Sequence, residues 1–137
     1  MDSAAPTGLV TRRIDHVGVL VSDMAAAAAR FHGELGLIDE GAWHDPDDRF
    51  ELRYLTAGDT TLQLVLPLGP GPLQDALDAR GEGLHHVCFV VDDLDAAIEG
   101  SGRALVAPPY MSGRGARVCF LKDRIHGVTI ELTEPPR

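Results

Sequence analysis

The hydrophobic pattern of the chain occurs twice. Residues 14–24, IDHVGVLVSDM, realign onto residues 84–94, LHHVCFVVDDL. In each copy a short apolar run rich in β-branched residues leads to a Ser or Asp and then to a segment rich in alanine. Such runs are typical of strands, and Ser or Asp commonly caps a following helix. Each copy therefore predicts a strand, a turn and a helix, within an internal repeat.

The two halves also match at their ends, where residues 61–64, TLQL, correspond to residues 129–132, TIEL. Further strands are predicted at residues 49–55 and 116–121, with weaker strand signals at 38–43 and 105–107. Each half is therefore predicted as βαβββ. A segment rich in Pro and Gly separates the halves and leads into a short predicted helix over residues 73–80, which Gly81 ends.

This pattern predicts an α+β fold. A four-stranded module of this size cannot cover both faces of its own sheet, so the two modules are expected to pack edge to edge, or to pair with a second chain, and to form one curved mixed sheet. We expect a single domain over residues 1–137, with module 1 at about 14–66, a linker at 67–83 and module 2 at about 84–134. The concave side of the sheet would then be lined by both halves.

Four polar residues occupy equivalent places in the two halves. His16 and His86 interrupt the first apolar run of each half, and Gln63 and Glu131 interrupt the last. A single histidine in such a strand is more often a hydrogen-bonded core residue, and a single carboxylate often points outwards. The repeat favours ligation, because a pseudo-two-fold axis would bring all four side chains to one place. Four N and O donors predict one divalent metal, with positions left for water or substrate.

The remaining histidines and the two cysteines have simpler interpretations. His32, His44 and His126 fall at a helix end or in polar loops, where exposure is expected. His85 neighbours His86 but points to the other face of its strand, which favours a supporting or packing role. Two cysteines, at positions 88 and 119, lie in apolar runs and are expected to be buried free thiols.

The composition of the chain limits which binding partners and which cellular location are expected. The chain has 21 acidic and 12 basic residues and no run of Lys or Arg, which argues against a basic surface for nucleic acid. No apolar stretch resembles a secretory signal or approaches the length of a membrane-spanning helix. We therefore expect a cytoplasmic protein with a small-molecule substrate, without nucleic acid or membrane partners.

These motifs resemble the vicinal-oxygen-chelate superfamily, which comprises glyoxalase, bleomycin-resistance and dioxygenase proteins, and within it the methylmalonyl-CoA epimerases. The resemblance covers about residues 14–134 and is carried by residues 14–18, 35–37, 81–87, 91–94, 115–121 and 130–132. It implies the same four ligands as the repeat, which are His16, Gln63, His86 and Glu131. The metal would be cobalt, manganese, nickel or zinc. It also implies a homodimer.

The implied activity is epimerisation at the α carbon of an acyl-CoA thioester, through a metal-stabilised enolate. Glu131 would be one of two bases. At the place of the second base, a glutamate in the epimerases we would align, this chain has Asp47, and Arg49 takes the place of a glycine. Either Asp47 or Glu51 reaches the site, or the loop serves another reaction.

Two other functions stay open. The first is a metalloenzyme of a specialised pathway, an isomerase, decarboxylase or lyase acting on a related acyl thioester or β-keto acid. The second is a non-catalytic protein that binds a small molecule. The presence of all four donors counts against this second alternative.

Overall fold

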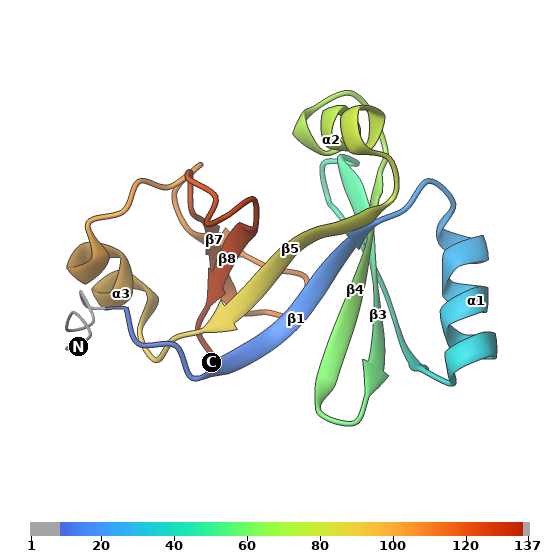
Figure 1. The fold of residues 1–137 in the computed structure, drawn as a ribbon, viewed down its shortest axis with the longest axis horizontal. Coiled ribbons are helices and arrows are strands. Elements are labelled where there is room, and N and C mark those ends of the chain that lie inside the picture. The colour runs from blue at the N-terminus through green and yellow to red at the C-terminus, as the bar shows by residue number, and fades with distance from the viewer. Residues whose placement is uncertain (1–8, 136–137) are drawn as a thin grey trace. The chain divides into compact units, whose positions relative to one another are not determined.

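The computed structural model describes residues 9–135 of the chain (Figure 1). Residues 1–8 and 136–137 lie outside it, and with them part of the N-terminal stretch in which no signal sequence was predicted. The chain divides into two compact units. Of the described residues, unit 1 contains 9–15 and 87–135, and unit 2 contains His16–His86. Each unit is described by itself.

The element order confirms the repeat of strand, helix and three strands. The elements are β1 (Arg13–Leu20), α1 (Met24–Leu35), β2 (Ile38–His44), β3 (Phe50–Ala57), β4 (Thr60–Pro67), α2 (Pro72–Arg80), β5 (Gly83–Val90), α3 (Leu94–Ser101), β6 (Tyr110–Met111), β7 (Arg117–Phe120) and β8 (Thr129–Thr133).

One predicted strand was misplaced. The strand expected at residues 105–107 is absent from the described structure, where Leu105 makes only an isolated bridge to Leu121. The short strand β6 pairs with β7 further along the chain. Pro108 and Pro109 separate the two places and lack the N–H that a strand ladder requires, so regular pairing begins after them.

In unit 2 the strands lie in the order β2-β3-β4-β1. Strands β2, β3 and β4 pair antiparallel, and β4 pairs parallel with β1. Helix α1 packs on one face of this sheet (Figure 1), where Met24 and Ala28 contact a cluster with Val21, Leu55 and Leu64. The side chain of Asp23 caps the start of α1, and Gly36 ends it at a positive φ of 71°.

The other face of the unit 2 sheet carries a second apolar cluster. Its buried members are Leu20, Leu52, Tyr54 and Val65, and residues Leu73, Ala76 and Leu77 of α2 pack against it. Helix α2 therefore covers part of the face opposite α1.

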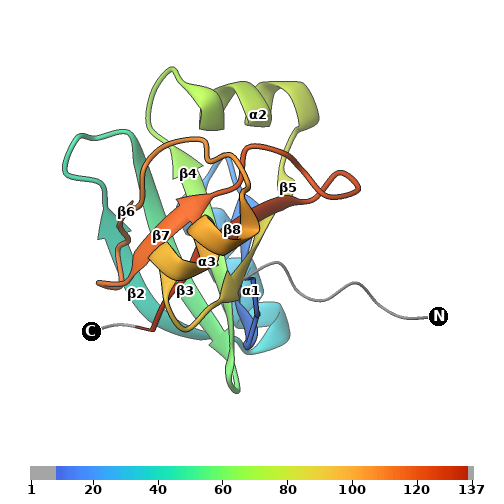
Figure 2. The same cartoon turned by 90° about the vertical axis from the view of Figure 1, so that its left-hand side faces the viewer.

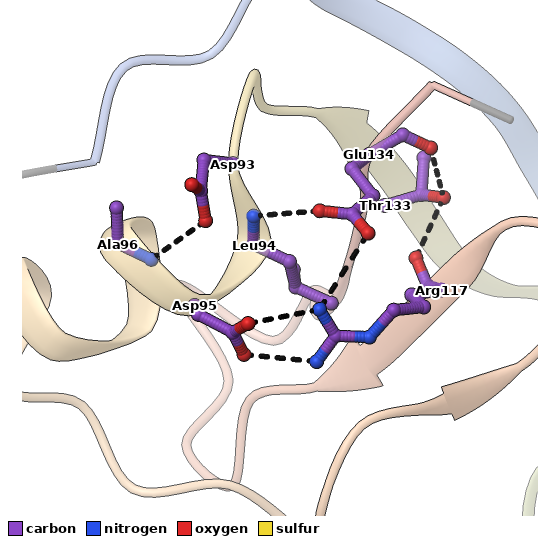
Figure 3. A network of polar contacts seen from close by, with 7 residues as sticks. All are labelled: Asp93, Leu94, Asp95, Ala96, Arg117, Thr133 and Glu134. Carbon is purple, nitrogen blue, oxygen red and sulfur yellow. Dashed lines mark hydrogen bonds and ion pairs between the residues drawn. The ribbon is translucent and has the colours of Figure 1, made fainter. Parts of the chain in front are cut away.

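In unit 1 the strands lie in the order β5-β8-β7-β6, with α3 packed on one face (Figure 2). Leu94 and Ala97 of α3 contact Cys119, Ile130 and Leu132 of the sheet. Two polar contacts fix the start of α3 (Figure 3): Glu134 accepts a hydrogen bond from the backbone N–H of Leu94, and Arg117 forms a two-pronged ion pair with Asp95. The start of β7 and the residue after β8 are thereby tied to the start of α3.

Equivalent polar contacts fix the entrance of each first strand. In unit 1, Arg12 before β1 forms an ion pair with Asp92, which follows β5. In unit 2, Glu82 before β5 accepts a 2.9 Å hydrogen bond from the backbone N–H of Ser22, which follows β1. These pairs occupy matching places in the repeat. The glutamate of the segment at residues 81–86, GEGLHH, thus has a structural partner.

Among the described residues, no helix is long and apolar enough to cross a membrane.

Candidate functional site

Three of the four predicted metal ligands lie in unit 2. The register between β1 and β4 pairs His16 with Thr61 and Gly18 with Gln63. Because side chains alternate along a strand, His16, Gly18 and Gln63 share one face. This is the face opposite α1, since Val19 and Leu64 pack on the α1 side. The local sequence thus places two potential ligands on neighbouring strands and on the same face.

The imidazole of His86 meets that of His16. Their Nε2 atoms lie 3.1 Å apart, and the rings stand nearly perpendicular with centroids 5.2 Å apart. Both residues are only 4% exposed, and Gln63 is 7% exposed. Two imidazole nitrogens that face each other in the interior can share one hydrogen bond, or they can both direct lone pairs at a cation.

His85 contacts the other side of the His86 ring. The two Nδ1 atoms lie 2.8 Å apart, and the rings are again close to perpendicular. A proton on Nδ1 of His86, donated to Nδ1 of His85, leaves the Nε2 lone pair of His86 available to a metal. Histidine ligands in metal sites usually donate their second ring nitrogen in this way. The contact agrees with the supporting role expected for His85.

Glu131, the fourth predicted ligand, lies in unit 1 on β8. It is 5% exposed and faces away from α3, because its neighbours Ile130 and Leu132 pack towards that helix. The alternative of an outward-facing carboxylate is therefore wrong. Burial and the Glu131 carboxylate together raise the pKa of the Cys88 thiol, which stays protonated. Cys88 and Cys119 are both buried free thiols, as predicted.

The loop between β2 and β3 carries Asp47, the predicted second base. Asp47 is exposed, whereas Asp45 is 2% exposed and accepts hydrogen bonds from Arg49 through Nε at 2.7 Å and Nη2 at 3.0 Å. Asp48, at a positive φ of 55°, bonds to His44 at 2.6 Å. Arg49 thus holds the loop closed on Asp45 and leaves Asp47 at its tip. This internal pairing could not be anticipated from residue types alone.

Glu51 was the alternative base, and its place in the sheet argues against it. In the register of β3 with β4, Glu51 pairs with Leu66 and Tyr54 pairs with Gln63. Alternation then puts Glu51 on the α1 face and Tyr54 on the face of Gln63. Asp47 lies outside β3, so the alternation of side chains along that strand does not fix the direction of its side chain.

The Asp45–Arg49 pair should make the free energy of unfolding depend on pH. The hydrogen bond from Arg49 holds the pKa of Asp45 below its ordinary value. The resulting stability is present above the unfolded-state pKa of about 4 and is lost as the pH falls through the folded-state pKa. Asp45→Asn is expected to cost about 1.5–3 kcal/mol at pH 7. Urea unfolding of both proteins between pH 7 and pH 3 checks this, and a cost that stays constant over this range would contradict it.

Comparison with known proteins decides the family. The model of the glyoxalase/bleomycin resistance protein/dioxygenase superfamily matches residues 15–120. The chain belongs to this superfamily. The predicted α+β fold with two βαβββ modules is thereby confirmed, and solved structures of the same fold superpose well on this member.

Relatives of this superfamily member include named epimerases. The ethylmalonyl-CoA/methylmalonyl-CoA epimerase of Cereibacter sphaeroides is 32% identical, over 89% of this chain and 97% of that protein. The crystal structure of methylmalonyl-CoA epimerase from Mycobacterium tuberculosis has a TM-score of 0.84 and 30% identity, covering 94% of this chain and 91% of that one. A Streptomyces coelicolor methylmalonyl-CoA epimerase variant, in complex with 2-nitronate-propionyl-CoA, has a TM-score of 0.82 and 27% identity, covering 93% of this chain and 100% of that one. The predicted resemblance to methylmalonyl-CoA epimerases is confirmed.

Proposed function

We propose that this chain is a divalent-metal-dependent epimerase that interconverts (2R)- and (2S)-methylmalonyl-CoA. The carrying observation is the buried pair of His16 and His86, whose Nε2 atoms face each other on the face of Gln63. The substrate class comes from the relatives, whose names specify methylmalonyl-CoA and ethylmalonyl-CoA and one of which binds a CoA thioester analogue.

His16, Gln63, His86 and Glu131 would hold the metal. Two imidazoles, an amide oxygen and a carboxylate suit cobalt, manganese, nickel or zinc, and all four residues are buried. A bound divalent ion supplies Lewis acidity towards the carboxylate and thioester oxygens of the substrate. The fit rests on the donor set and on the Nδ1 contact of His86 with His85. With the proton on Nδ1 of His86, the Nε2 lone pair of this residue is available to a cation.

Glu131 and Asp47 would carry the protons. One carboxylate takes the α proton, and the electron pair of the C–H bond moves towards the thioester oxygen. The other carboxylate, in its acid form, returns a proton to the opposite face of the α carbon. No atom is gained or lost, so the reaction needs no co-reactant. Chemistry of this kind requires the two groups on opposite sides of the substrate.

Asp47→Ala tests the second base. The variant is expected to keep its metal, because the side chain is exposed and is no proposed ligand, and to lose turnover by about 10²–10⁴-fold. Asp48→Asn is the matched control, since Asp48 is the exposed neighbour in the same loop and asparagine tolerates its positive φ of 55°. Turnover of methylmalonyl-CoA and metal content are measured for all three proteins. A rate near wild type for Asp47→Ala would remove Asp47 from the mechanism.

The function itself is tested by isotope exchange. Metal-loaded protein is incubated in deuterated water with (2S)-methylmalonyl-CoA or with ethylmalonyl-CoA, and the α carbon is followed by NMR together with the stereochemistry of the product. Deuterium incorporation with inversion is the expected result. Metal-loaded protein that exchanges neither substrate would exclude this epimerase function.

A second candidate is a metalloenzyme of a specialised pathway that acts as an isomerase, decarboxylase or lyase on a related acyl thioester or β-keto acid. The observation that favours it is the Asp45–Arg49 pair, which occupies the loop where the epimerases carry their second base. Deuterium exchange without inversion, or loss of carbon dioxide, would support this candidate. The homodimer and the cytoplasmic location stay predictions.

A further inference from the structure

Gly18 lies in the middle of strand β1 without the usual reason for a glycine. It is not among the described residues with positive φ, so its backbone is one that any residue adopts. Glycine inside a strand weakens the strand, because it packs no side chain and loses more backbone entropy than other residues. The reason for a glycine at this position must therefore lie in its surroundings.

The ring of His86 fills the space that a side chain at position 18 would need. A Cβ built on Gly18 would lie 2.0 Å from Cε1, 2.3 Å from Nδ1 and 2.6 Å from Nε2 of His86. Other described glycines contrast with this one: Gly33 and Gly69 have no atom within 4 Å of an added Cβ. Any residue larger than glycine at position 18 must move the imidazole.

The imidazole cannot move without losing contacts. Its Nε2 lies 3.1 Å from Nε2 of His16, its Nδ1 lies 2.8 Å from Nδ1 of His85, and His86 is 4% exposed. A methyl group at position 18 would turn the His86 ring away from Nε2 of His16 and from Nδ1 of His85. The same position in the second half of the repeat is Cys88, so the repeat as such does not demand a glycine.

We propose that Gly18 is a positioning residue that sets the orientation of the His86 imidazole and thereby the affinity of the site for a divalent metal. Its role in orienting His86 stands on the geometry, and its role in metal affinity rests on the proposed function. Gly18 acts by the space that it leaves and touches neither metal nor substrate.

The first arm of the test measures metal affinity. Apo protein is titrated with Co²⁺ and followed by its visible absorption, for wild type, Gly18→Ala and the control Gly33→Ala. Gly33 lies in α1 at an ordinary φ and with open space around it. We expect Gly18→Ala to bind Co²⁺ about 10–100-fold more weakly and Gly33→Ala to bind as wild type does. Unchanged affinity in Gly18→Ala would overturn the proposed effect on the metal.

The second arm of the test needs no metal. It separates the orienting role of Gly18 from the proposed metal-dependent function. Urea midpoints are measured in chelator for wild type, Gly18→Ala, His86→Ala and the double variant. We expect Gly18→Ala to lower the midpoint in the presence of His86 and to lower it much less when residue 86 is alanine, because the clash is gone. Equal effects in both backgrounds would overturn the orienting role. Wild type that binds no Co²⁺ but shows this coupling would instead reject the metal-dependent function and leave the orienting role supported.

Discussion

Replacing His86 with alanine is expected to abolish tight binding of a divalent metal. The His86 imidazole is buried against His16, and its second nitrogen is already engaged by His85. Its removal deletes one of four proposed ligands and leaves the remaining three without the geometry that a small cation requires. Because a ligand that binds only the folded state stabilises it, the variant should also lose the stability gained from metal, about 2.7 kcal/mol at a metal concentration 100 times the Kd.

Calorimetric titration and thermal unfolding with and without Co²⁺ measure both effects. His44→Ala is the control, because His44 is an exposed histidine in the same unit and bonds to Asp48 rather than to a proposed ligand. It should bind metal with wild-type stoichiometry. One metal per chain in His86→Ala, at wild-type affinity, would remove His86 from the ligand set.

Replacing Glu131 with glutamine should reduce turnover of methylmalonyl-CoA by about 10²–10⁴-fold. The glutamine side chain has nearly the same shape but cannot accept a proton from the α carbon or contribute a negative charge to the metal. Glu131 is only 5% exposed, so bulk water has little access to its side chain. The metal affinity of Glu131→Gln should fall as well.

Glu134→Gln is the matched control for Glu131→Gln. Glu134 is a second buried glutamate and directly follows β8, but it accepts a hydrogen bond from the backbone N–H of Leu94 and faces Arg117 (Figure 3). Its replacement is expected to lower stability and to leave turnover unchanged well below the unfolding temperature. Equal loss of turnover in both variants would show that the loss comes from removing a buried negative charge in this part of the chain and not from removing the proton acceptor Glu131.

The sequence predicted most of the fold because two independent patterns agreed. The match of residues 14–24 with residues 84–94 gave the repeated strand and helix, and polar residues at equivalent places pointed to candidate ligands. Within unit 2, the structure brings His16 and His86 into contact and puts Gln63 on their face. A repeat is informative because equivalent positions in the two halves have similar structural environments, so the interpretation of one half supports that of the other.

Other features depended on contacts that residue types do not specify. The pairing of Arg49 with Asp45 closes the loop that carries Asp47, although in sequence the arginine is simply the residue found in place of a glycine. Gly18 appeared as part of a motif, whereas its relation to the His86 ring requires coordinates. The misplaced strand at residues 105–107 reflects a short apolar segment whose pairing was decided by the two prolines after it.

The most direct test of metal-dependent chemistry at an α carbon follows one preparation through a metal cycle. The rate of deuterium incorporation into (2S)-methylmalonyl-CoA is measured on the protein as purified with metal, after removal of the metal by a chelator, and after return of Co²⁺. We predict rapid exchange, then loss of exchange, then recovery. Exchange that persists at the same rate in fully stripped protein, with metal content verified, would contradict the account.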